Sequence, residues 1–200
     1  MPNNTEQEAT NHPDENLNDS AVIIEGIPFI LQKHTFWCGY TSLAMVLQYY
    51  GHQDITPERV FEQLHGEEAP AKELLNPKPR PDADTLASLA RELTRDSSKK
   101  LEARIISDDD YVKLNMEPHD VLQRFVKAGV PCIVRTPGHF KIVSGFNTGN
   151  DTYRFHDPFR GILEYETDYF KSGWAEKDMG HGTRDARNLL LAIYPDRKAS

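Results

Sequence analysis

Apolar residues along this chain follow first a helical and then a strand-like pattern. Across residues 38–50 they recur at intervals of three and four, which predicts a helix buried along one face and stopped by Gly51. Two further helices are predicted over residues 56–66, where a threonine cap precedes a proline, and over residues 84–95. Between these two helices, residues 70–81 contain four prolines and predict a loop.

The second half of the chain is richer in strands. A helix is predicted over residues 118–128, and residues 139–147 and 152–157 form two alternating runs joined by Thr148-Gly149-Asn150-Asp151, which is typical of a hairpin turn. The other predicted strands span residues 101–106, 131–135, 161–167 and 189–194. Because helices come first and strands follow, the sequence predicts an α+β domain.

Composition bounds the domain organisation. Residues 1–20 are almost wholly Asn, Glu, Asp, Thr and Pro, which predicts a disordered acidic and polar tail, because so few apolar groups cannot offset the entropy of ordering. The remaining chain, residues 21–197, is expected to form a single domain. Of the 200 residues, 38% are hydrophobic and 27% charged, values that are ordinary for one globular domain of this size.

Net charge and hydropathy narrow the function classes. The formal charge is -8, from 31 acidic and 23 basic residues, which argues against a nucleic-acid partner or an anionic membrane surface. No stretch approaches the ~18 apolar residues of a membrane span, and the N-terminus does not resemble a signal peptide. A cytoplasmic location is therefore the default expectation, with export by a signal-independent route left open. The sequence does not indicate an oligomeric state.

One cysteine lies where a loop enters the first predicted helix. At Cys38 the unpaired amides and the dipole of a helix start would favour the thiolate, the form that attacks a carbonyl. Gly39 would let a substrate backbone approach closely. Gln32, upstream on the same loop, can turn back so that its amide points at the oxygen of an attacked carbonyl. The backbone amide of Cys38 could be the second donor.

A nucleophilic thiol needs a nearby base, and that base needs a group to fix its tautomer. His139 opens a predicted strand, an end position where a polar side chain can face a cleft. Asp157 closes the other arm of the predicted hairpin, so antiparallel pairing brings it to the same end of the sheet. The pattern predicts Cys38 as nucleophile, His139 as base, Asp157 as the orienting group and Gln32 in the oxyanion hole.

Other residues of this region have simpler interpretations. Cys132 lies in an apolar run and is expected in the core, although a Cys38–Cys132 disulfide is a weaker alternative. Strand alternation places His156 on the opposite face from Asp157, which predicts a surface histidine. A metal site made of Cys38, His139, His156 and Asp157 would lack the close paired spacing of structural zinc sites, so neither a metal nor another cofactor is expected.

Two acidic features of the sequence also have simple structural explanations that involve no catalysis or metal binding. Asp157 precedes Pro158 and could serve only to form a turn. The run Asp108-Asp109-Asp110 lacks the glycine and the distal glutamate of a calcium-binding loop, so it predicts a helix start or a turn.

Taken in order, the motifs resemble those of papain-like cysteine peptidases of the bacteriocin-processing, double-glycine type. The resemblance extends over about residues 24–174. Its motifs are Gln32 with Trp37-Cys38-Gly39, then Ser42-Leu43-Ala44-Met45, Gly129-Val130-Pro131-Cys132-Ile133-Val134, Gly138-His139-Phe140-Lys141-Ile142-Val143-Ser144-Gly145-Phe146, and Asp157-Pro158-Phe159-Arg160-Gly161 followed by Tyr165 and Trp174.

This resemblance implies a papain-like fold, with N-terminal helices packed on a C-terminal antiparallel sheet. It also implies that Gln32, Cys38, His139 and Asp157 have the family's oxyanion, nucleophile, base and orienting roles. Leader peptidases of this type are normally fused to a membrane transporter with a nucleotide-binding domain. Neither a membrane span nor a phosphate-binding glycine loop is found in this sequence, so cleavage of double-glycine leaders is not predicted.

The predicted activity is a cysteine hydrolase, a peptidase or amidase that forms an acyl-enzyme on Cys38. Its expected partner is a peptide or protein substrate. An acyl transferase or transpeptidase with the same site is an alternative that the sequence does not separate, because the difference lies in the acceptor pocket. A catalytically silent peptide-binding module of the same fold is a second alternative, and the complete set of four residues argues against it.

Overall fold

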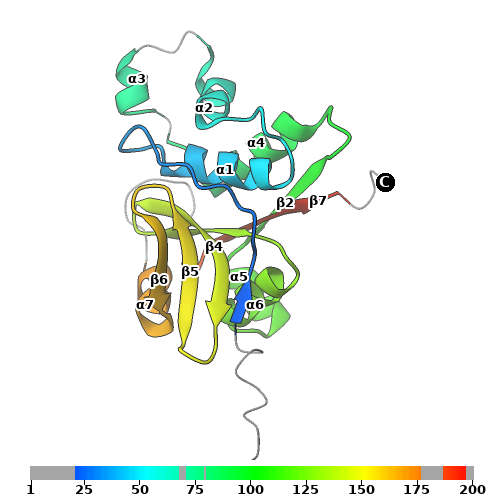
Figure 1. The fold of residues 1–200 in the computed structure, drawn as a ribbon, viewed down its shortest axis with the longest axis vertical. Helices are drawn as coiled ribbons and strands as arrows, with labels where there is room; N and C mark the ends of the chain where they lie inside the picture. The colour runs from blue at the N-terminus through cyan, green and yellow to red at the C-terminus, as the bar shows by residue number, and fades with distance from the viewer. Residues whose placement is uncertain (1–20, 68–70, 79, 177–186, 197–200) are drawn as a thin grey trace, which may run out of the picture.

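The computed structural model describes residues 21–67, 71–78, 80–176 and 187–196. One group of helices lies at one end of the molecule, and the broad part of the sheet lies below it, flanked by α5 and α6 on one side and by α7 on the other (Figure 1). The predicted α+β class is confirmed, with the N-terminal helices packed on the sheet. The predicted tail, residues 1–20, lies outside the described residues.

The N-terminal helices follow the sequence pattern closely. Their bounds are α1 (Cys38–Tyr49), α2 (Pro57–His65), α3 (Ala71–Leu75) and α4 (Ala83–Thr94). The side chain of Thr56 accepts a hydrogen bond from the amide of Arg59, which caps α2 as predicted. Residues 70–81 do not form only a loop, because α3 lies inside this proline-rich stretch.

The sheet of the described residues has seven strands, and every neighbouring pair is antiparallel. Its order is β2-β7-β3-β4-β5-β6, and β1 also pairs with β4. The bounds are β1 (Ala21–Ile23), β2 (Leu101–Ile106), β3 (Cys132–Thr136), β4 (His139–Asn147), β5 (Thr152–Asp157), β6 (Gly161–Glu166) and β7 (Leu190–Pro195). The predicted hairpin of β4 and β5 is confirmed.

Three helices flank the sheet: α5 (Asp108–Leu114), α6 (Pro118–Lys127) and α7 (Thr167–Ala175). The acidic run at Asp108 is a helix start, as predicted, and the Asp110 carboxylate accepts a hydrogen bond from the amide of Ser107. Helix α7 was not predicted, and it packs Phe170 and Trp174 against the sheet. Within the described part of the chain, no helix has the length and apolar character needed to cross a bilayer.

Two contacts of the entry segment position the loop that leads to α1. A Cβ on Gly145 would lie 2.7 Å from the carbonyl oxygen of Val22, so only glycine lets β1 approach β4 this closely. The backbone N–H of Gln32 donates to the carbonyl oxygen of Pro158 at 2.7 Å. The loop is thereby fixed beside the turn that follows β5, next to the residues predicted to form the site.

Candidate active site

Cys38, the predicted nucleophile, is the first residue of α1. Its side chain is only 8% exposed, and the first turn of the helix contains no acidic residue to offset the partial positive charge of the helix start. Helix α1 runs through the core, with every residue from Cys38 to Leu47 buried. Cys38 and Cys132 are both free, so the disulfide alternative is wrong. Cys132 is fully buried, as predicted, and burial raises the pKa of its thiol.

His139 lies between Cys38 and Asp157 and is hydrogen-bonded to both. Its Nε2 atom is 2.9 Å from Oδ1 of Asp157, which leaves Nδ1 for the thiol of Cys38. Burial lowers the pKa of His139, but the hydrogen bonds and charges of Asp157 and Cys38 outweigh burial and raise the pKa from 6.5 to about 9. A charged imidazolium therefore lies next to the thiol of Cys38, which is the pairing of base and nucleophile that thiol catalysis uses.

Asp157 is 2% exposed and combines two functions in one carboxylate. Besides the bond with His139, Oδ1 accepts hydrogen bonds from the amides of Phe159 at 2.9 Å and Arg160 at 3.1 Å. Burial raises the pKa of Asp157, whereas His139 and these two amides lower it more, so the pKa lies below its ordinary value of 3.8. The side chain of Asp157 is therefore a charged carboxylate. It stabilises the turn and also holds the ring of His139.

Gln32 lies on the loop before Cys38, but its amide is engaged within that loop. Its Nε2 atom donates to the carbonyl oxygens of His34 at 2.8 Å and Thr35 at 2.9 Å, which uses both amide hydrogens. Its Oε1 atom is buried and has no hydrogen-bond partner among the described residues. In this conformation Gln32 closes the loop and presents no free donor to Cys38.

His156 lies on the opposite face of β5 from Asp157, as strand alternation predicts, but it is only 4% exposed. The prediction of a surface histidine is wrong because the entry segment covers this face, and the imidazole is hydrogen-bonded to the backbone of Pro28. Burial, and then the charge of Arg154, lower the pKa of His156. This residue is separate from the group around Cys38.

A buried polar network supports the start of α1 from behind. The hydroxyl group of Tyr40 lies 2.8 Å from Nε2 of His65, and Nδ1 of His65 lies 3.6 Å from the carboxylate of Glu73. The indole N–H of Trp37 donates to the carbonyl oxygen of Leu74 at 2.9 Å. Helices α2 and α3 are thus tied to the residues on either side of Cys38, a connection that the sequence pattern did not reveal.

Two hollows flank the Cys38–His139 pair. A slot of about 40 Å³ borders Cys38, and its walls include Gly39, Pro81 and Phe140. A cavity of about 380 Å³ lies on the side of His139 and Asp157. Its lining includes Lys141, which sequence reasoning missed, because a lysine in a strand ordinarily predicts an exposed position.

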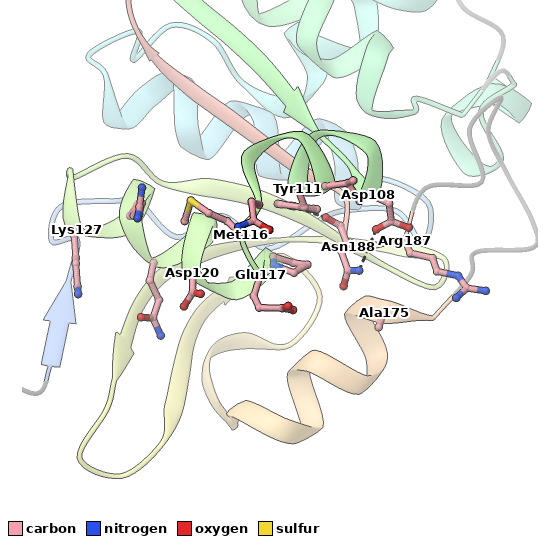
Figure 2. A pocket seen from close by; sticks show the side chains of 14 residues that line it. Asp108, Tyr111, Met116, Glu117, Asp120, Lys127, Ala175, Arg187 and Asn188 are labelled. Carbon is pink, nitrogen blue, oxygen red and sulfur yellow. Dashed lines mark hydrogen bonds between the residues drawn. The ribbon is translucent and has the colours of Figure 1, made fainter.

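A larger hollow lies elsewhere, between α5, α6 and α7, and has a volume of about 1000 Å³ (Figure 2). Its lining carries charges of both signs, and Asn188 there donates to the carboxylate of Asp108 at 3.1 Å. None of the four predicted site residues lines it. The described residues also contain no group of three His, Cys, Asp or Glu side chains placed to hold a metal ion.

Comparison with known proteins identifies the family of this chain. The model of the Peptidase C39 like family matches residues 24–178. The chain belongs to this family. The resemblance to double-glycine peptidases that the motifs indicated is therefore confirmed, and the family is one of papain-like cysteine peptidases. No curated protein matches the sequence.

Solved structures resemble the fold, and they include the three that follow. A double glycine motif protease from an AMS/PCAT transporter, crystallised with its leader peptide, has a TM-score of 0.53 and 21% identity over 88% of this chain and 99% of that one. The peptidase domain of Streptococcus ComA has a TM-score of 0.53 and 17% identity, covering 86% of this chain and 100% of that domain. UfSP from C. elegans has a TM-score of 0.50 and 14% identity, covering 94% of this chain and 36% of UfSP. These likenesses establish the papain-like fold.

Proposed function

We propose that this chain is a cysteine hydrolase that cleaves a peptide or amide bond through Cys38, His139 and Asp157. The observation that carries the proposal is the hydrogen-bonded line from the thiol of Cys38 through the ring of His139 to the carboxylate of Asp157. Nucleophile, base and orienting group are the three parts that thiol catalysis needs. The catalytic unit is proposed to be one domain of residues 21–197, and its cytoplasmic location remains a prediction.

The proposed reaction proceeds in two steps. The Cys38 thiolate adds to the substrate carbonyl, and the His139 imidazolium then gives its proton to the leaving amine as the C–N bond breaks. This leaves a thioester on Cys38. In the second step neutral His139 takes a proton from water, the hydroxide adds to the thioester, and the carboxylic acid product leaves as the Cys38 thiolate is restored. Asp157 holds the ring of His139 in place throughout.

The oxyanion hole has one donor that needs no movement. The backbone N–H of Cys38 belongs to the first turn of α1, where amides have no partner within the helix. Gln32 can supply the second donor only if its amide leaves the carbonyl oxygens of His34 and Thr35 and turns toward the substrate. We therefore assign Cys38 N–H as the fixed donor and Gln32 Nε2 as a donor recruited on substrate binding.

The slot beside Cys38 bears on the substrate. At about 40 Å³ it has room for only a few water molecules, so it suits a residue with a small side chain before the scissile bond. A peptide substrate also agrees with the transporter protease, whose structure contains a leader peptide. We propose a peptide substrate with a small residue at this position.

The test uses quenched fluorescent peptide mixtures with glycine or phenylalanine fixed before the cleaved bond. Cleavage of the glycine mixture by the wild type, with a covalent acyl adduct on Cys38 detected by intact mass, is expected. Cleavage should disappear in Cys38→Ala and His139→Ala. Transfer of the acyl group to added glycine amide in place of water would identify a transferase. A folded wild type that forms no acyl adduct and cleaves nothing would identify a silent binding module.

A further inference from the structure

The cavity beside His139 contains a buried lysine that the proposed reaction does not use. Lys141 follows His139 by two residues on β4, so both side chains point to the same face of the sheet, toward α7. Lys141 is 8% exposed, although lysine is rarely buried without a compensating partner. The cavity has a volume of about 380 Å³, enough for several side chains or a short peptide segment.

Aromatic rings hold Lys141 in place. Its Nζ atom lies 4.8 Å from the ring centre of Phe155 and 4.9 Å from that of Tyr165. Such cation–π contacts fix an ammonium group but do not neutralise its charge. Burial lowers the pKa of Lys141, with the charge of Asp157 opposing this effect and that of Arg160 adding to it. A bound anion would relieve the cost of burying this cation.

A second cation stands at the same cavity. Arg160 comes from the turn after β5, and its guanidinium donates to the hydroxyl group of Tyr165 at 3.4 Å. Two carboxylates also line the cavity. Asp157 is occupied by His139 and by two backbone amides, and Glu176 is an exposed residue at the end of α7.

The position of the cavity relates it to one half of the substrate. It is lined by His139 and Asp157 but not by Cys38, whereas the slot is lined by Cys38 but not by His139. The acyl half of the substrate becomes attached to Cys38, and the leaving amine receives its proton from His139. The cavity therefore lies where the leaving half would extend.

We propose that this cavity binds a carboxylate on the leaving half of the substrate, with Lys141 and Arg160 as its two cationic contacts. The inference rests on the proposed function for the direction of the substrate. The protein has a net charge of -8, so its surface as a whole repels acidic peptides. A cationic subsite would favour acidic leaving groups in spite of this repulsion. The carboxylate can belong to an Asp or Glu side chain or to the end of the peptide chain.

The test is a binding experiment that needs no catalysis. The full chain is labelled with [ε-¹³C]lysine, and the Lys141 resonance is identified by its loss in Lys141→Met. Three tripeptides serve as models of the leaving half: Ala-Glu-Ala amide, Ala-Gln-Ala amide, and Ala-Gln-Ala with a free C-terminal carboxylate. At least one of the two acidic peptides should shift the Lys141 resonance and bind about tenfold more tightly than the neutral one, as expected for a charge-assisted contact.

Binding of the acidic peptides should weaken by about tenfold in both Lys141→Met and Arg160→Gln. Lys127→Met is the matched control, because Lys127 lines the other hollow and its loss should change nothing. The side-chain and C-terminal probes separate the two sources of the carboxylate. Equal binding of all three peptides, or binding that is insensitive to Lys141→Met, would overturn the subsite and leave Lys141 as a counter-charge for Asp157.

Failure of the subsite and failure of the hydrolase proposal remain distinguishable. Alkylation of Cys38 by iodoacetamide reports the Cys38–His139 pair without involving the leaving half of a substrate. An activated Cys38 together with equal tripeptide binding would reject the subsite alone. An unactivated Cys38 together with selective binding of acidic peptides would reject the hydrolase alone.

Discussion

The Nε2 atom of His139 lies 2.9 Å from Oδ1 of Asp157, and the same carboxylate oxygen accepts two backbone amides from the turn that follows it. This arrangement couples the orientation of His139 to the end of the β4–β5 hairpin. Because the carboxylate is held by three donors, its position does not depend on the histidine alone. His139 is therefore presented to Cys38 by a preformed part of the sheet.

Replacing Asp157 with asparagine should lower the pKa of His139. The negative charge that stabilises the imidazolium would be lost, so the pKa should fall from about 9 toward its ordinary value of 6.5. Titration of the ring by NMR measures this change directly. A pKa near 9 in Asp157→Asn would mean that Asp157 does not hold the charge on the base.

The same pair predicts how stability depends on pH. The pKa of His139 is raised in the folded state, so its contribution to the free energy of unfolding is complete below pH 6.5. This contribution is lost as the pH rises through about 9. The pKa of Asp157 is lowered in the folded state, so its contribution to the free energy of unfolding is present above pH 3.8 and is lost as the pH falls. Urea unfolding should show the largest difference between wild type and Asp157→Asn from pH 3.8 to 6.5, and a smaller one above pH 9. If the difference in stability between the two proteins were the same in both pH ranges, this predicted pH dependence would be wrong.

Gln32→Ala separates the oxyanion role of Gln32 from its role in the loop. If the amide turns to the substrate during the reaction, kcat should fall by about 10²–10³, the usual cost of one lost oxyanion donor. The alkylation rate of Cys38 should change little, because no oxyanion forms in that reaction. An unchanged kcat, with only reduced stability, would show that Gln32 does no more than close the loop through His34 and Thr35.

Gly39→Ala should destabilise the fold. A Cβ at this position would lie 3.2 Å from Cγ of Pro81 and 3.3 Å from Cδ2 of Phe140, and relieving this overpacking should cost about 1–3 kcal/mol. Gly173→Ala is the matched control, because a Cβ on this glycine of α7 would meet nothing within 4 Å. The control should keep or gain stability by up to about 1 kcal/mol. Equal urea midpoints for both variants would show that the wall of the slot is not tightly packed.

The sequence predicted the elements that carry the site, since Cys38 at a helix start and His139 and Asp157 at one end of a hairpin follow from local patterns. It did not predict properties that depend on what covers a strand. His156 is buried because the entry segment lies over it, and Lys141 is buried among residues of β5, β6 and α7. Gln32 was predicted beside Cys38, but the engagement of its amide by its own loop depends on a conformation that residue spacing does not encode.

Activation of Cys38 by His139 is tested by the rate of Cys38 alkylation by iodoacetamide as a function of pH, followed by intact mass. Wild type, His139→Ala and Cys132→Ser should be compared, since the buried Cys132 is expected to be unreactive in the folded chain. We predict one adduct, formed rapidly well below pH ~8.5, where an ordinary cysteine ionises. This reactivity should be lost in His139→Ala and kept in Cys132→Ser. A rate that rises only near pH ~8.5, or that His139→Ala leaves unchanged, would show that His139 does not activate Cys38.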